Sequence, residues 1–228
     1  MIALGLTGVK PIDELLEPID ERWIVELYGD SNAVLRVMHY AMVYRSRDNA
    51  VHVVFNVEFG GIDTLYFARL CRVLDCKPDS IFISRAFRLK ETLNILKELL
   101  KVQRSTVLLV FPYRYLPKNP SKYTVATEIT GIIGRLALSN RVLLFNSLSN
   151  FGYYMPEGGS LHHHLVKVIV KLTRKNKWIL ADLVKHPVKQ QGTRVFAEKT
   201  LEHPIPQLQK RTLLDWTARF KATKSVYI

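Results

Sequence analysis

The feature that most constrains the fold is an alternation of short apolar runs with longer amphipathic stretches. Five runs of strand length are separated by four stretches in which apolar residues recur at helical spacing. The expected strands lie at 23–28, 51–56, 80–85, 106–111 and 141–146, and the expected helices at 33–45, 62–74, 90–102 and 123–138. Alternation at this spacing predicts an α/β fold with a mostly parallel central sheet flanked by helices on both faces.

The pattern changes after residue 160. Three β segments at 165–173, 178–185 and 193–197, separated by turn signals, predict antiparallel strands added to the sheet edge. The segment from Pro204 onward predicts an amphipathic helix that docks on the sheet or offers a face to another protein. We therefore expect one core domain over 1–203 and an amphipathic tail over 204–228.

Positive charge is concentrated in the second part of the chain. The net charge is +13, but residues 1–100 carry 12 Lys/Arg against 14 Asp/Glu, whereas residues 101–228 carry 21 against 6. Lysine and arginine gain by displacing counterions from phosphates, so this asymmetry favours a nucleic-acid partner. A solvated basic surface that aids solubility would give the same counts.

Compartment can be predicted from what the sequence lacks. No apolar run reaches the roughly 18 residues that span a bilayer, which predicts no membrane association. The first residues lack the zones of a signal peptide. Cys71 and Cys76 are the only cysteines, and we expect them to be core thiols in a reducing cytoplasm.

Six short motifs occur in a fixed order along the chain. The first joins Thr7-Gly8 to an Ile-Asp-x-Leu-Leu run, and the others follow at or near the ends of the expected strands. They are Thr7–Leu16 (TG-x₃-ID-x-LL), Trp23–Gly29 (WIVELYG), Val54–Glu58 (VFNVE), Phe82–Phe87 (FISRAF), Leu143–Ser147 (LLFNS) and Pro156–His164 (P-x-GG-x₄-H).

These motifs resemble, in order, those of the RadA/RecA recombinase core, over most of the chain. The resemblance implies a RecA-like core without the helix-hairpin-helix domain that precedes it in the family. In the family, the strand matching WIVELY leads into a P-loop, G-x-x-x-x-G-K-[ST], which wraps phosphates and magnesium.

Here the P-loop position carries Gly29-Asp30-Ser31-Asn32-Ala33-Val34-Leu35-Arg36. Val34 replaces the lysine, Leu35 replaces the hydroxyl residue, and the loop is one residue short. Asp30 adds negative charge where phosphates would lie. We therefore expect no nucleotide binding at this degenerate loop.

Other phosphate-handling positions are also altered. Phe111 follows the strand whose family counterpart ends in a magnesium-supporting aspartate, and Ser147 replaces the glutamine that senses the γ-phosphate. Glu58 matches the glutamate that activates water, but without a clamped phosphate we favour a structural role for it, capping a helix or pairing with Arg85. We predict no catalytic residue and no cofactor.

Two loops that contact DNA in the family have counterparts in this chain. The first, at 112–123, interleaves tyrosines with cations, as single-strand binding requires. The second, at 149–159, is aromatic and glycine-rich and could stack on bases or dock on a protein. With the basic turn that follows, the candidate DNA-binding residues are Tyr113, Arg114, Tyr115, Lys118, Lys122, Tyr123, Phe151, Tyr153, Tyr154, Arg174, Lys175 and Lys177. Packing of the tyrosines on the core, and a solvated hairpin turn, are the alternatives.

The run His162-His163-His164 does not predict a metal site. Adjacent residues on a strand point to opposite faces, so three in a row do not converge on one ion. His164 matches the single family histidine, for which we expect a hydrogen-bonded structural role.

Three hypotheses follow. The first is an ATPase-inactive RadA-like paralog that binds DNA, single-stranded by preference, and modulates recombination or repair. The second is a pseudo-ATPase subunit that partners an active RadA-type recombinase without contacting DNA. The third, an enzyme with an atypical nucleotide site, is disfavoured by three lost phosphate-handling positions. The family's phenylalanine-containing assembly motif has no counterpart here, so we expect no self-filament; a dimer stays open.

Overall fold

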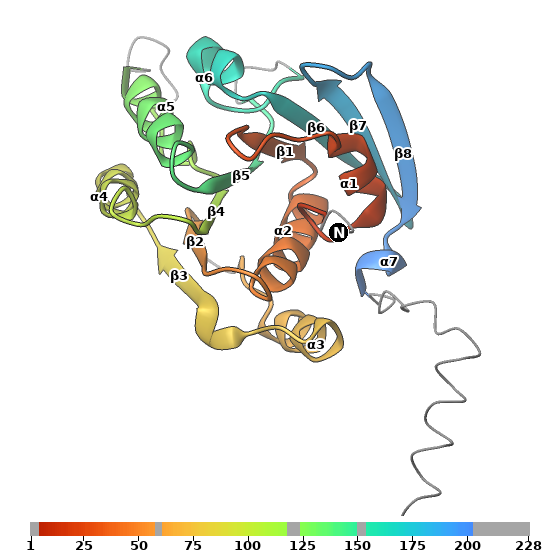
Figure 1. Ribbon diagram of the computed structural model, residues 1–228. Helices are drawn as coiled ribbons and strands as arrows, with labels where there is room; N and C mark the ends of the chain where they lie inside the picture. The colour runs from red at the N-terminus through yellow and green to blue at the C-terminus, as the bar shows by residue number, and fades with distance from the viewer. Residues whose placement is uncertain (1–4, 58–60, 118–123, 150–153, 203–228) are drawn as a thin grey trace, which may run out of the picture.

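The computed structural model describes residues 5–57, 61–117, 124–149 and 154–202 of the 228-residue chain (Figure 1). One mixed eight-stranded sheet forms its centre, in the order β3-β2-β4-β5-β1-β6-β7-β8. The strands are β1 (Val25–Gly29), β2 (Val51–Phe55), β3 (Ile81–Arg85), β4 (Thr106–Val110), β5 (Arg141–Asn146), β6 (Val168–Lys175), β7 (Trp178–Lys185) and β8 (Gly192–Ala197).

The five strands predicted to be parallel are confirmed, and so are two of the three predicted to be antiparallel; the first of these three, β6, pairs in parallel with β1 instead. β1 to β6 pair in parallel, and β7 and β8 are added antiparallel to β6. β1 and β4 are buried along their whole length, as expected for central strands that are covered on both faces.

Helices cover the two faces of the sheet in separate groups (Figure 1). They are α1 (Lys10–Leu16), α2 (Ser31–Arg45), α3 (Thr64–Leu74), α4 (Leu89–Leu99), α5 (Thr124–Leu136), α6 (Gly159–Leu165) and α7 (Lys199–Glu202), with a 3₁₀ turn at Pro78–Ser80. α1, α2 and α3 close one apolar core with Leu27 and Val110. α4 and α5 close a second core, on the opposite face, with Ile24 and Leu109.

Three helices were not predicted from the sequence: α1, α6 and the four-residue α7. α1 has only seven residues, and its Asp13 side chain bonds the preceding segment: Oδ1 accepts from Thr7 N and Oγ1 at 2.7 and 2.8 Å, and Oδ2 accepts from Gly8 N at 2.9 Å. α6 contains the three histidines, so the strand assumed for them was wrong. His162 is the buried member and His164 is exposed, which contradicts the structural role expected for His164.

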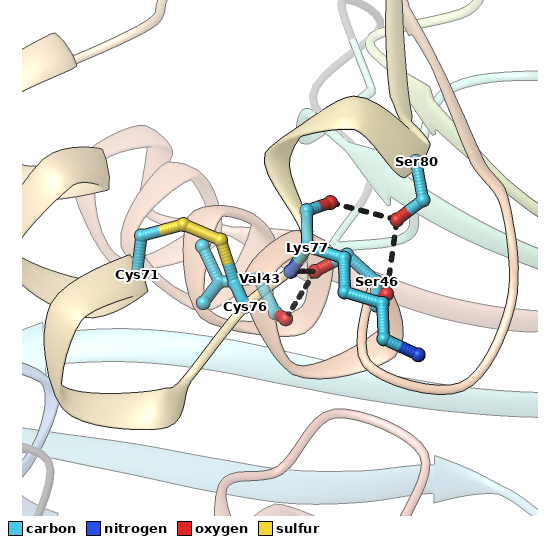
Figure 2. Close-up of a disulfide and its surroundings, with 6 residues drawn as sticks. All are labelled: Val43, Ser46, Cys71, Cys76, Lys77 and Ser80. Carbon is cyan, nitrogen blue, oxygen red and sulfur yellow. Dashed lines mark hydrogen bonds between the residues drawn. A yellow bond between two sulfur atoms is a disulfide. The ribbon is translucent and has the colours of Figure 1, made fainter.

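The expectation for the cysteines was also wrong. Cys71 and Cys76 form a disulfide across the end of α3, where Asp75 has a left-handed backbone (φ 53°). Figure 2 shows this turn beside Ser46, whose carbonyl accepts a 2.9 Å hydrogen bond from Ser80 Oγ. The argument for a reducing compartment assumed unpaired thiols, so that argument is lost. Within the described ranges, no helix combines the length and apolarity needed to cross a membrane.

Candidate functional site

The six parallel strands all finish at the same end of the sheet. We call this end, where their carboxyl termini lie, the carboxyl edge; it is distinct from the outer strands of the sheet. The connection after β1 runs toward β2, whereas the connection after the neighbouring β5 runs toward β6. In open α/β sheets, ligands bind outside the carboxyl ends of the strands where the connections of two neighbouring strands run in opposite directions. The strands β1, β2, β3 and β5, which carry four of the six motifs, end at this edge, whereas the Thr7–Leu16 motif lies near Arg45 and Arg141 at the opposite end of the sheet.

The P-loop position holds no phosphate-sized loop. Gly29 is the last residue of β1, Asp30 caps α2, and Ser31 already belongs to the helix. The Asp30 carboxylate accepts a 3.0 Å hydrogen bond from Ala33 N. A Cβ on Gly29 would lie 2.2 Å from the Leu172 carbonyl oxygen. The helix N-terminus that would receive a phosphate is therefore capped by the protein's own carboxylate.

The position of the second acidic motif is apolar. Phe111 is buried, has a positive φ of 51°, and donates its N–H to the Phe145 carbonyl at 2.7 Å. Its own carbonyl accepts from Asn56 Nδ2 at 3.2 Å. Val34 is fully buried and Leu35 is half-buried. Glu58 lies outside the described residues.

A pocket of about 440 Å³ opens beside the N-terminal half of α2. Its two arginines flank Glu198, with Arg174 Nε at 3.0 Å and Arg36 Nε at 3.7 Å from the carboxylate. His39 donates from Nδ1 to the Leu35 carbonyl and accepts from Asp63 N at Nε2, so its ring is neutral. Burial lowers the pKa of His39, which agrees with that state. Both arginines of the pocket are thus paired with Glu198, and Asp63 adds a second carboxylate to the lining.

A buried polar network lies beneath the carboxyl edge, on the face covered by α5 and α6. Glu26 Oε1 accepts from Asn146 Nδ2 at 2.8 Å and lies 2.9 Å from His162 Nε2. Tyr113 Oη lies 2.9 Å from both His162 Nδ1 and Thr130 Oγ1.

The hydrogen positions in this network follow from its chemistry. Thr130 donates its only hydroxyl proton to the Ala126 carbonyl, so Tyr113 must donate to Thr130. His162 Nδ1 must then donate to Tyr113. One further proton lies between His162 Nε2 and Glu26 Oε1, as an imidazolium–carboxylate pair or its neutral equivalent. Burial raises the pKa of Tyr113, which keeps the phenol protonated.

The first predicted DNA loop is only partly exposed. Tyr113 was expected to stack on bases, but the side chain is 1% exposed and fills the second core. That assignment was wrong: the hydroxyl is needed inside the network. Tyr115 is half-buried and donates to the Ala86 carbonyl at 3.0 Å, whereas Arg114 is exposed. Lys118, Lys122 and Tyr123 lie outside the described residues.

The two ends of the second predicted loop are held together by hydrogen bonds. Leu148 pairs with Pro156 in an isolated antiparallel bridge, and Asn146 Nδ2 donates to the Glu157 carbonyl at 2.6 Å. Tyr154 is 80% exposed, and Lys171 Nζ lies 5.0 Å from its ring centroid. Phe151 and Tyr153 lie outside the described residues.

The basic turn between β6 and β7 also lies at the carboxyl edge, because β6 runs parallel to β1. Arg174, Lys175 and Lys177 are exposed there. Arg174 reaches back to Glu198 and therefore has a structural role. Lys175 pairs across the strands with Trp178, which is 53% exposed.

Sequence reasoning missed an open face of the sheet. Alternate residues of β6, β7 and β8 point away from the first core, and no described helix lies over them on β7 and β8 (Figure 1). We call this surface the open face. Its three cross-strand rows are Lys171–Asp182–Thr193, Thr173–Leu180–Val195 and Lys175–Trp178–Ala197.

The signal for the open face was present in the sequence. Lys171, Thr173 and Lys175 alternate with the buried Val170 and Leu172, which is the pattern of a strand with one solvated face. From the sequence, only the cations of the turn were predicted to bind DNA. Trp178 was predicted to lie in a strand, without a prediction of the face on which its side chain lies.

No model of a known protein family matches this sequence, and none of the curated proteins compared with it gives a match.

Proposed function

We propose that this chain binds single-stranded DNA along the carboxyl edge and the open face, without using ATP, and modulates recombination or repair. The observation that carries the proposal is the juxtaposition of exposed rings and cations. Tyr154 lies against Lys171, and Trp178 lies across from Lys175. Aromatic faces for bases, interleaved with cations for phosphates, are the requirements of single-strand binding.

The RadA-like part of the proposal rests on the ordered sequence motifs. The fold supports it, because the degenerate P-loop strand is central and the strand-end motifs meet at one edge of a mostly parallel sheet. The capping of α2 by Asp30 and the burial of Phe111 favour a protein that neither binds nor hydrolyses ATP.

Fluorescence anisotropy with a labelled single-stranded oligonucleotide, over a range of salt concentrations, tests the proposal. Trp178→Leu should weaken binding by about 1–3 kcal/mol at every salt concentration, since it removes one stacking face. The combined change of Arg114, Lys175 and Lys177 to glutamine should lower the salt slope by about two, because each lost single-strand phosphate contact removes about 0.7.

A charge-matched control is available on the other side of the molecule. Arg47, Arg69 and Arg72 are exposed near or on α3, and their combined change to glutamine removes the same charge. If this control weakens binding as much as the carboxyl-edge variant, the interaction is only a response to net charge and the proposed site is wrong. No binding of wild type at low salt would remove the DNA function itself.

The partner-subunit alternative is favoured by one separate observation. Within the described part of the chain, β3 is an edge strand that pairs with β2 alone, and Phe82 and Ile83 on it and Phe87 just after it are each 45–50% exposed. An edge with apolar side chains can accept an added strand from another protein. Ile83→Lys should abolish binding to an active RadA-type recombinase and leave oligonucleotide binding unchanged.

A further inference from the structure

Arg45 is buried at the end of the sheet opposite the carboxyl edge. It is the last residue of α2, is 6% exposed, and its Nε atom has no hydrogen-bond partner within the described part of the chain. Its ion pair with Asp48 joins Nη1 and Oδ2 at 4.0 Å, which is too long for a hydrogen bond. Leaving a buried charged donor unpaired is unfavourable.

A pocket of about 580 Å³, which we call the amino-edge pocket, opens at this position. It lies at the starts of β4 and β5, where Arg104 and Arg141 contribute to its lining together with Arg45. Four arginines line it against two carboxylates, Asp20 and Glu21.

The pocket also contains a second unpaired polar group. Thr106 is fully buried, and its Oγ1 has no hydrogen-bond partner among the described residues. Thr106 points to the same face of β4 as Leu108, which is the face covered by α2. Arg45 and Thr106 therefore line the pocket from the same side of the sheet, and each has a buried donor without a hydrogen-bond partner among the described residues.

We propose that the amino-edge pocket binds a phosphate dianion, either free or as the monoester of a small molecule. A phosphate oxygen pair matches the planar donors of a guanidinium, and a further oxygen can accept from a hydroxyl. Among the described residues, the Arg141 guanidinium pairs at this pocket with Glu21, whose side chain is 88% exposed, so a dianion can displace it. The pocket is larger than phosphate alone, which leaves room for an organic group.

The electrostatics of Arg45 agree with an anionic ligand. Burial, followed by the nearby charge of Arg141, lowers the pKa of the Arg45 guanidinium. An anion between the two arginines would offset both effects.

Calorimetric titration and thermal unfolding of the full chain with inorganic phosphate test this inference. Phosphate should raise the melting temperature in a saturable manner, as mass action requires, whereas sodium chloride at equal ionic strength should not. Arg104→Gln changes an exposed residue and should weaken phosphate about tenfold. Arg135→Gln, on exposed α5 surface outside the pocket, is the matched control and should bind as wild type does.

Arg45→Lys tests the buried donor, because it keeps the charge but loses the planar donor set; it should also weaken phosphate. A small sugar phosphate distinguishes the two sources: tighter binding than inorganic phosphate indicates a monoester, and equal binding indicates free phosphate. The inference is overturned if chloride reproduces the stabilisation, or if Arg104→Gln binds phosphate like wild type. Because the pocket lies at the other end of the sheet, the Arg114, Lys175 and Lys177 variant should keep phosphate binding even if DNA binding fails.

Discussion

His162 Nε2 lies 2.9 Å from Glu26 Oε1, with both side chains fully buried and joined across 136 residues of sequence. The pair links α6 to the first half of β1, and Asn146 extends the link to the base of the second loop. The other Glu26 oxygen has no hydrogen-bond partner among the described residues. A buried pair of this kind is costly to break from one side.

We therefore predict strong coupling between Glu26 and His162. Glu26→Leu and His162→Phe should each destabilise the protein by about 3–5 kcal/mol, because each leaves its partner buried and unpaired. The double variant should lose much less than the sum of the two. Urea denaturation of the four proteins gives the coupling energy, and additive losses would show that the pair does not act as a unit.

A second prediction concerns Tyr113, whose hydroxyl bridges Thr130 and His162. Tyr113→Phe should cost about 1–3 kcal/mol of unfolding free energy, since His162 Nδ1 is left without its acceptor. Oligonucleotide affinity should not change, because the ring is buried. Tyr154→Phe is the control. Because the Tyr154 ring is exposed, loss of its hydroxyl should change the free energy of unfolding by no more than about 0.5 kcal/mol. A loss of affinity without a loss of stability in Tyr113→Phe would mean that the hydroxyl acts in DNA binding rather than in the buried network.

The architecture was largely predictable, because strand-length apolar runs and helical periodicity are local signals. Trp178–Lys185 was predicted with the bounds that β7 has in the structure. The site was harder to predict, since it depends on contacts between distant segments. Nothing near Tyr113 in sequence indicates that His162 would take its hydroxyl into the core. α1 and α6 have seven residues each, which is too short for periodicity to be distinguished from a loop or strand.

A third prediction follows from the Cys71–Cys76 disulfide. It closes a loop with a sequence separation of 5, and a loop of that size contributes about 2 kcal/mol through the entropy of the unfolded chain. Reductant should lower the free energy of unfolding by about that amount. The double variant Cys71→Ser, Cys76→Ser should be equally destabilised and insensitive to reductant. An equal response of wild type and double variant to reductant would show that the effect does not pass through these cysteines.

The last prediction concerns the pH dependence set by Asp13. Burial raises the pKa of Asp13 from 3.8 to about 6, and the hydrogen bonds from Thr7 and Gly8 oppose that rise only in part. The folded state therefore binds this proton more tightly than the unfolded state does. The associated stability is fully present below pH 3.8 and is lost as the pH rises through about 6.

In the Asp13→Asn variant the side chain at this position cannot titrate. The unfolding free energy of wild type minus that of the variant should therefore fall as the pH rises across this window. The fall should total about 3 kcal/mol, from two pKa units at about 1.4 kcal/mol each. Urea denaturation at a series of pH values between about 3.5 and 7 measures it. Glu17→Gln removes a nearby negative charge that also raises the pKa of Asp13. This variant should therefore lower the pKa of Asp13 in the folded state, and the loss of stability should end at a lower pH. A difference that stays constant with pH would mean that the three hydrogen bonds balance burial, and one that grows as the pH rises would mean that they outweigh it and lower the pKa of Asp13 in the folded state.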